Sequence, residues 1–204
     1  MKIVIIGPPT SGKGTQSKLI KSEMGLVHVS TGDIFRNILK KENKISKSVE
    51  KYQKNTLMVP DKLTIRILKN YLKEKKINDN YVLDGYPRTL TQAKDLLKSK
   101  KVDHMIILNL EYDDALKRME ERLMCSECMK TYKSVNTKMK CNECGGDLIK
   151  RNDDTEDNLK KRFIQYDTET VGAIKFLKGK INYTEIDARL DSDEIFKQIK
   201  GKVG

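Results

Sequence analysis

The chain has 204 residues, of which 37% are hydrophobic and 34% charged, so it is long enough for one buried core with small insertions. It contains no apolar run of membrane-spanning length and no signal-peptide pattern at its start, which favours a cytoplasmic protein over a membrane-bound or secreted one. The net charge of +12 favours anionic partners, either nucleotides or nucleic acids. Many lysines fall in predicted solvated helices and are expected to serve solubility, and the 4 Phe and absent Trp leave little surface for stacking bases.

The first predicted element is a buried strand, since four of the five residues from 2 to 6 are Ile or Val. Residues 7–15 then read GPPTSGKGT, and a helical pattern begins near Lys13. This is the context of a phosphate-binding loop, in which backbone N–H groups and a helix N-terminus face a polyanion and a lysine adds charge. Gly14 stands where most such loops carry the hydroxyl that binds magnesium, which narrows the field to enzymes that move phosphoryl groups between nucleotides. A chance glycine–lysine loop is the competing interpretation.

A second strand is predicted at residues 26–29, ending in Ser30-Thr31-Gly32-Asp33, where a helix begins. Ser30 and Asp33 fit a capping box. The alternative is a pocket for a second nucleotide, with Thr31 near the base and Arg36 one turn into the helix. Residues 40–55 are polar and predict short helices that leave the core, and Pro60 suits the first turn of the next helix.

A third strand is predicted at residues 81–84, followed by Gly85-Tyr86-Pro87-Arg88-Thr89. A carboxylate at the end of a parallel strand beside the phosphate loop, here Asp84, is suited to ordering magnesium-bound water. Arg88 is suited to binding a phosphate bidentately. The competing interpretation is a turn with a helix cap, because Thr89 and Gln92 also fit a capping box.

A fourth strand is predicted at residues 104–110, and the helix from about Asp113 is predicted to carry Arg118 and Arg122 on one face. Ion pairing of these arginines with Asp114, Glu120 or Glu121 is the alternative.

The four cysteines read Cys125-x2-Cys128-x12-Cys141-x2-Cys144, which predicts a tetrahedral structural zinc site. The enclosed segment has too few large apolar residues for a core of its own, so metal would supply its folding energy. Four cysteine ligands leave no open position, which argues against catalytic zinc. Redox-active thiols and a nucleic-acid-binding ribbon remain the alternatives.

Residues 151–156 lead into a helix with Arg162, which Asp153 or Asp154 is expected to cap. Surface ion pairing is the alternative role of Arg151 and Arg162, since acids bracket both. An edge strand at residues 182–186 and an apolar-faced helix complete the chain. Strands therefore alternate with helices, which predicts an α/β fold with five parallel strands and two excursions, near residues 31–60 and 123–158.

Taken in order, these motifs resemble the adenylate kinase family, in its long form with a zinc-bearing lid, over essentially the full length of the chain. The motifs that carry the resemblance are residues 7–16, 30–36, 57–61, 84–92, Arg118 with Arg122, the four cysteines, and Arg151-x-Asp-Asp with Arg162. The resemblance implies a P-loop NTPase fold with a five-stranded parallel sheet flanked by helices. Its core would comprise residues 1–30, 61–122 and 159–204, with a helical AMP-binding insertion at 31–60 and a zinc-ribbon lid at 123–158.

The activity implied by the resemblance is reversible, magnesium-dependent transfer of a phosphoryl group from ATP to AMP, giving two ADP without a covalent intermediate. A UMP/CMP or broader nucleoside monophosphate kinase is the alternative within the class, and a zinc-ribbon nucleic-acid-binding NTPase is the alternative outside it. The implied partners are ATP, AMP and ADP, and we expect a monomer that binds neither nucleic acid nor membrane.

The resemblance also assigns roles to residues. The ATP-binding residues would be Gly7, Pro8, Pro9, Thr10, Ser11, Gly12, Lys13, Gly14, Thr15, Arg118 and Arg122. The AMP-binding residues would be Thr31, Arg36, Leu57, Met58, Val59, Gly85, Arg88, Gln92, Arg151 and Arg162. Charge at the transferred group would be stabilised by Lys13, Arg88, Arg122, Arg151 and Arg162. Asp84, with Asp33, would hold Mg²⁺ through water, and the structural Zn²⁺ would be bound by Cys125, Cys128, Cys141 and Cys144.

The chain departs from the family pattern at several positions. Thr10 stands where the family usually has Gly, so we expect a strained loop backbone or an altered phosphate contact. Tyr86 replaces the usual Phe, and the x12 gap between the cysteine pairs is shorter than in many zinc lids. Residues 187–190 lack the expected glycine, which leaves the adenine-side backbone contact open.

Overall fold

The computed structural model describes residues 1–41, 43–99, 102–133 and 140–203, so small parts of the predicted core, insertion and lid lie outside the described residues. Its centre is a five-stranded sheet in the order β2-β3-β1-β4-β8. Every pairing in it is parallel. The strands are β1 (Lys2–Ile6), β2 (Val27–Ser30), β3 (Tyr81–Asp84), β4 (His104–Asn109) and β8 (Asn182–Asp187). The predicted five-stranded parallel sheet is therefore confirmed.

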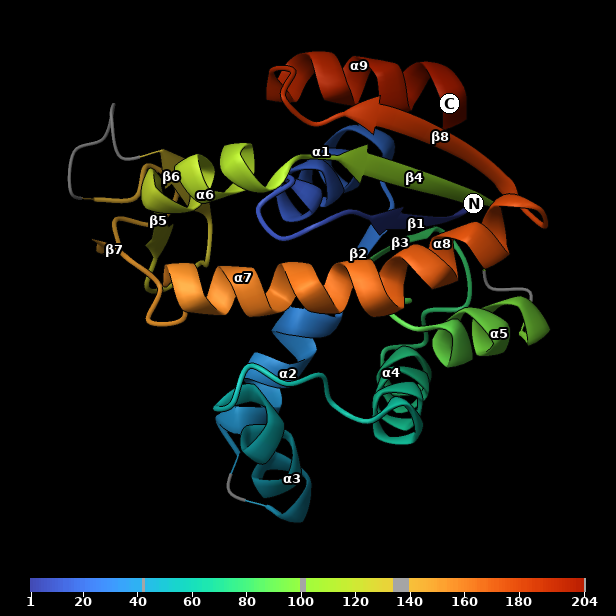
Figure 1. The fold of residues 1–204 in the computed structure, drawn as a ribbon, viewed down its shortest axis with the longest axis horizontal. Helices are drawn as coiled ribbons and strands as arrows, with labels where there is room; N and C mark the ends of the chain where they lie inside the picture. Colours follow the sequence, from blue (N-terminus) through green and yellow to red (C-terminus); the bar gives the residue numbers. More distant parts are fainter. Residues whose placement is uncertain (42, 100–101, 134–139, 204) are drawn as a thin grey trace.

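Helices cover both faces of this sheet because its strands are apolar on both sides. Ile3 and Ile5 of β1 pack into one apolar cluster, whereas Val4 and Ile6 pack into another. The first cluster includes side chains of α1 (Lys13–Met24), α6 (Tyr112–Glu120) and α9 (Ser192–Val203). The second includes side chains of α4 (Asp61–Glu74), α5 (Leu90–Lys98) and α8 (Val171–Lys178). Figure 1 shows α9 over one face and α8, α5 and α4 over the other.

The parallel arrangement brings the carboxyl ends of the strands to one edge. Ile5 of β1 pairs with Asp84 of β3, and Ser30 of β2 pairs with the same aspartate. The loop after β1, the start of the helix after β2 and the turn after β3 are therefore neighbours at that edge.

The first excursion contains α2 (Thr31–Leu39) and α3 (Lys44–Gln53), as the polar stretch predicted. Ser30 caps α2, because its hydroxyl accepts from the backbone N–H of Asp33. A capping box at Asn43 and Ser46 begins α3. Ile34, Val49 and Val59 are buried in the same cluster as the core helices α4 and α5. The insertion therefore shares the hydrophobic core of the main sheet.

The second excursion is a small antiparallel sheet in the order β6-β5-β7. Its strands are β5 (Arg122–Cys125), β6 (Thr131–Lys133) and β7 (Leu148–Ile149). Only Cys125, Cys141 and Leu148 form its buried cluster among the described residues. Figure 1 shows this lid at one end of α7 (Glu156–Gln165), which continues through the π-helical segment η2 (Tyr166–Thr170) into α8.

Two local predictions are wrong. Arg122 does not share a helical face with Arg118, because α6 ends at Glu120 and Arg122 opens β5. Neither Asp153 nor Asp154 caps α7, since the hydroxyl of Thr155 accepts from the Asn158 N–H instead. Both aspartates pair with arginines.

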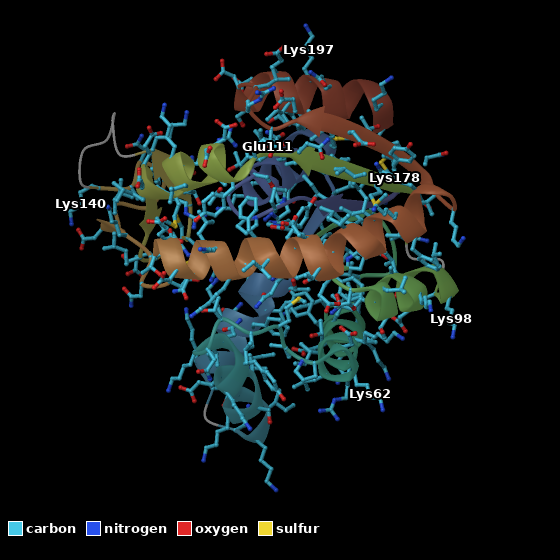
Figure 2. All side chains as sticks on the ribbon, in the orientation of Figure 1. Lys62, Lys98, Glu111, Lys140, Lys178 and Lys197 are labelled. Atoms are coloured by element: carbon cyan, nitrogen blue, oxygen red, sulfur yellow. The ribbon has the colours of Figure 1, made fainter. Side chains whose placement is uncertain are left out.

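Among the described residues, no helix combines the length and apolar character needed to cross a membrane. Figure 2 shows Lys62, Lys98, Lys140 and Lys197 at the outer boundary of the molecule, where they point into solvent. These lysines come from α4, α5, the lid and α9, so part of the positive charge is dispersed over the surface.

Candidate active site

The loop between β1 and α1 has the backbone expected of a phosphate-binding loop. Gly12 precedes α1 with φ of 87°, a left-handed conformation that glycine adopts without steric cost, and no side chain of the described residues caps the helix. A Cβ at Gly7 would lie 2.6 Å from the Leu108 carbonyl oxygen, so only glycine fits there. The first N–H groups of α1 therefore lie at a helix N-terminus that no side chain caps, where an anion is favoured.

Lys13 bends back into this loop. Its Nζ donates to the carbonyl oxygens of Gly7 at 2.9 Å and Pro8 at 2.6 Å, and to the Ser11 hydroxyl at 3.3 Å. Burial lowers the pKa of Lys13 to about 8, with Asp84 opposing the shift and the guanidinium groups of Arg88, Arg122 and Arg162 adding to it. A bound polyphosphate would stabilise the charged ammonium.

Thr10 has a left-handed backbone, with φ of 61°, which confirms the strain expected at this position. Its hydroxyl lies 2.7 Å from the carbonyl oxygen of Pro9 and 3.0 Å from that of Ala115. The loop is therefore tied to α6, the helix that leads into the lid.

Asp84 lies beside the first turn of α1, since a Cβ on Gly14 would be 3.6 Å from its Oδ2. His28 of β2 lies 3.3 Å from the same oxygen through Nε2, and both side chains are largely buried. Burial opposes ionisation of Asp84, yet its pKa is lowered because His28, Lys13 and Arg88 favour the carboxylate. Sequence reasoning missed His28, because only the β2–β3 pairing brings it to Asp84.

Arg88 is held by its own turn and by two neighbouring elements. Its Nε donates to the Gly85 carbonyl oxygen at 2.9 Å, and the Thr31 hydroxyl donates to the same oxygen at 2.9 Å. The Arg88 carbonyl oxygen accepts from the hydroxyl of Thr170 at 2.9 Å. Burial lowers the pKa of Arg88, an effect that Asp84 opposes and Arg162 and Arg36 reinforce. The guanidinium therefore has two cationic neighbours and one anionic neighbour, Asp84, which favours binding of an anion beside it.

Gln92 supports this turn from α5. Thr89 caps α5 by accepting from the Gln92 N–H at 3.2 Å, but Gln92 Oε1 accepts from the Arg88 N–H at 2.8 Å. The other end of the amide donates to Asp61 at 2.8 Å, and Gln92 is 2% exposed. The Thr89 half of the predicted capping box is therefore formed. The Gln92 side chain, which would supply the other half, instead binds the backbone N–H of Arg88.

On α2, Arg36 forms an ion pair with Asp33, so two predicted site residues are partners. Within the described part of the chain, the buried Nε of Arg36 has no hydrogen-bond partner. Three predicted AMP-binding residues end the insertion, with Leu57 55% exposed and Val59 buried. Met58 between them is partly buried.

The remaining arginines converge from the lid and from α7. Arg122 pairs with Asp154, with its Nε 2.9 Å from Oδ2. Asp153 pairs with both Arg151 and Arg162, which lower its pKa to about 2 against the effect of burial. The ion pairing considered for Arg151 and Arg162 is therefore present. Arg122 and Arg162 also lower the pKa of Lys13, so their positive charges are felt electrostatically at the lysine of the phosphate loop.

Arg118 takes no part in that group. Its guanidinium donates to the carbonyl oxygen of Ala188, just after β8, in place of the acids considered from the sequence. Ala188 is fully buried, and the neighbouring Asp187 and Arg189 pair at the surface. The predicted adenine-side segment thus lies against α6.

In the lid, the Sγ atoms of the four cysteines all lie within 4.8 Å of one another. Cys125 and Cys141 are buried, while Cys128 and Cys144 are exposed. Gly145, with φ of 74°, donates to the Cys141 carbonyl oxygen at 3.0 Å, which forms a tight turn after the second cysteine pair. Four thiols in this arrangement are the donor set that a tetrahedral zinc ion prefers.

Comparison with known proteins bears on the whole chain. The family model described as adenylate kinase matches residues 5–182. The adenylate kinase of Clostridium acetobutylicum is 34% identical over 213 residues, covering 100% of this chain and 99% of that protein. That of Clostridium tetani is 35% identical, with the same coverage. That of Clostridium botulinum strain Eklund 17B is 35% identical over 208 residues, covering 98% of this chain and 97% of the relative.

Proposed function

The chain belongs to the adenylate kinase family, and we propose that the two nucleotides of its reaction meet between Lys13 and Arg88. The activity of the family is phosphoryl transfer between ATP and AMP, giving two ADP, and the alternative functions considered from the sequence are not favoured. The observation that carries the proposal is that one carboxylate, Asp84, acts on two cations. It favours the charged forms of both Lys13 in the phosphate loop and Arg88 in the turn after β3.

ATP would occupy the phosphate loop. Its phosphates would accept from the backbone N–H groups of residues 10–15, and Lys13 would exchange its carbonyl partners for the transferred group. Arg118 would face the adenine beside Ala188, a role supported by its bond to that backbone. Arg122 would reach the phosphates from the root of the lid.

AMP would lie across the ends of β2 and β3. Thr31 and the backbone of Leu57, Met58 and Val59 would contact its base, and Gly85 would allow close approach. The left-handed φ of 77° and the lack of room for a Cβ at Gly85 support that role. Arg36 and Arg88 would bind the phosphate, with Gln92 supporting Arg88 through its backbone.

Catalysis would consist of alignment and charge neutralisation. Phosphoryl transfer needs little covalent help, since the charge on the transferred group is spread over its oxygens. Lys13, Arg88, Arg122, Arg151 and Arg162 would supply five positive groups, and the acids that now pair with three of them would yield to phosphate oxygens. The lid would exclude water and so prevent hydrolysis of ATP.

The reaction of the family requires magnesium with the nucleotide. Asp84 fits a magnesium role through water, because its lowered pKa keeps it ionised beside the phosphate loop. Asp33 would assist after release from Arg36. Magnesium would neutralise phosphate charge when bound. The four cysteine thiolates would hold a structural zinc ion, which fits a lid whose own buried cluster is small.

The proposal extends to the divisions of the chain, its location and its oligomeric state. The divisions of the chain would be the core at 1–30, 61–122 and 159–204, the insertion at 31–60 and the lid at 123–158, supported by the separate lid sheet. We further propose a cytoplasmic monomer with no nucleic-acid partner, consistent with the dispersed lysines in Figure 2.

One assay tests the proposal. ATP and magnesium are supplied with AMP, UMP, CMP or no acceptor, and diphosphate formation is measured. We expect rapid ADP formation with AMP alone. Comparable rates with UMP or CMP would contradict the acceptor assignment, and phosphate release without an acceptor, raised by RNA or DNA, would instead support a nucleic-acid-dependent NTPase.

A further inference from the structure

Thr56, the last residue before the proposed AMP-contacting segment, has an unusual backbone. Its φ is 56°, in the left-handed region that a β-branched residue adopts only at a steric cost. Glycine would adopt the same conformation freely. A threonine here therefore indicates that its side chain makes an interaction that offsets this cost.

That interaction crosses from the insertion to α7. The Thr56 hydroxyl donates to Oδ1 of Asn158 at 2.6 Å. Separately, Nε2 of Gln165 donates to the Thr56 carbonyl oxygen at 2.6 Å. In Figure 1 the segment between α3 and α4 runs below α7, on the side of α7 that the insertion occupies. Two hydrogen bonds thus join one residue to the two ends of a helix 102 and 109 positions away.

The helix face involved is the one that carries Arg162. Asn158, Arg162 and Gln165 are spaced four and three residues apart, so they lie on one side of α7. Asn158 also donates to the Asp153 carbonyl oxygen at 3.4 Å, and the Asp153 carboxylate pairs with Arg151 and Arg162. The bridge from Thr56 therefore ends at the arginine cluster.

We infer that Thr56 is a positioning residue that fastens the AMP-contacting segment, residues 57–59, to the arginine-bearing face of α7 through Asn158 and Gln165. The inference rests on the proposed binding of AMP by the insertion. Residues 57–59 follow Thr56 directly, so fixing its hydroxyl and carbonyl oxygen fixes their distance from Arg162. The acceptor nucleotide would then meet a preformed site, and the donor would be unaffected.

The kinetic test compares Thr56→Gly, Thr56→Val and Thr56→Ser with the wild type. Loss of the hydroxyl in the first two should raise KM for AMP about five- to tenfold, the effect expected of one hydrogen bond, while KM for ATP changes less than twofold. Thr56→Ser should retain the wild-type KM. An unchanged KM for AMP in Thr56→Gly would overturn the inference, whether or not the valine variant folds.

Lys76 offers a matched control, because it has φ of 54° in an exposed turn after α4. Lys76→Gly should relieve the same backbone strain without changing either KM. A rise in KM for AMP in this variant equal to that of Thr56→Gly would assign the effect to general loosening, and so would contradict a bridge.

A second measurement does not depend on activity. In ligand-free protein, Asn158→Ala with Gln165→Ala should speed hydrogen exchange of the Leu57 amide, which donates to the Tyr52 carbonyl oxygen at 2.9 Å on the insertion. Unchanged exchange there would disprove the bridge. Faster exchange in a protein that forms no ADP from ATP and AMP would uphold the bridge and refute the proposed function.

Discussion

The insertion and the lid both bring cations to the same site, but they are stabilised in different ways. The insertion buries Ile34, Val49 and Val59 in the cluster that underlies the main sheet. Among its described residues, the lid buries only Cys125, Cys141 and Leu148, with Leu123 and Tyr132 packed against them. The insertion is therefore stabilised by the core, whereas the lid would be stabilised by the ion proposed for its four cysteines.

Substitutions in the insertion and in the lid are therefore expected to destabilise different parts of the molecule. A change in the insertion is expected to weaken the whole molecule, since its apolar side chains are part of the shared core. A change in the lid is expected to remain local and to affect activity through Arg122, which opens β5, and Arg151, which follows β7. The centre proposed for both excursions, the turn with Arg88, belongs to neither of them.

The largest effect is expected at that shared centre. Arg88→Ala should lower turnover by two orders of magnitude or more, about 3 kcal/mol, because the guanidinium would neutralise charge as the phosphoryl group moves. Steady-state assay of ADP formation measures it. Arg66→Ala, at an exposed position on α4, is the control and should keep normal turnover. Near-normal turnover of Arg88→Ala would remove the residue from the mechanism.

Metal removal should separate the two excursions. Chelation, or Cys141→Ser, should unfold the lid and lower turnover at least about tenfold, because structural zinc supplies folding energy to small domains. The insertion should keep its structure and its AMP affinity, as measured by calorimetric titration. Metal analysis should find one zinc per chain. Adding zinc back should restore turnover in the chelated wild type but not in Cys141→Ser. A lid that stays folded without metal would contradict the proposed difference between lid and insertion.

A matched pair of cavity-creating substitutions tests the cores directly. Val49→Ala in the insertion should lower global stability by about 2 kcal/mol, or about 5 °C in Tm, since Val49 is fully buried in the main cluster. Leu148→Ala in the lid should leave the main calorimetric transition within about 1 °C. Equal shifts would show that the lid and the core unfold as one unit.

The smallest expected effect concerns the joint between lid and core, where Asp153 pairs with Arg151 and Arg162. Because its pKa is lowered from 3.8 to about 2, its stabilisation is complete above pH 4 and is lost as pH falls towards 2. After solvent screening, the contribution is about 0.5–1 kcal/mol. Urea unfolding should therefore find Asp153→Asn less stable than the wild type at pH 7 but not at pH 2.

Asp187 is the control for that experiment, because it is about as exposed as Asp153 (42% against 40%) but pairs with a more exposed arginine, Arg189 (65%). Asp187→Asn should change the pH dependence less than Asp153→Asn does. A pH dependence that is the same in wild type and Asp153→Asn would mean that the joint contributes nothing to folding.

The sequence alone determined the elements that depend on local physics. Apolar runs gave the central strands, glycines gave the phosphate loop, and Ser30 and Thr89 capped their helices, because each of these features involves residues close in the chain. Cysteine spacing likewise predicted the cluster in the lid. The order of the motifs was enough to identify the family.

Only the tertiary structure decided which polar groups meet. The β2–β3 pairing brings His28 to Asp84, and Thr56 donates a hydrogen bond to α7. Arg122, where the chain enters the lid, pairs with Asp154, where the chain has left it. Each of these side chains had several possible partners of suitable charge or hydrogen-bonding capacity nearby in the sequence. Local preferences cannot rank partners that are separated by tens of residues, because the packing of whole helices and strands fixes those distances.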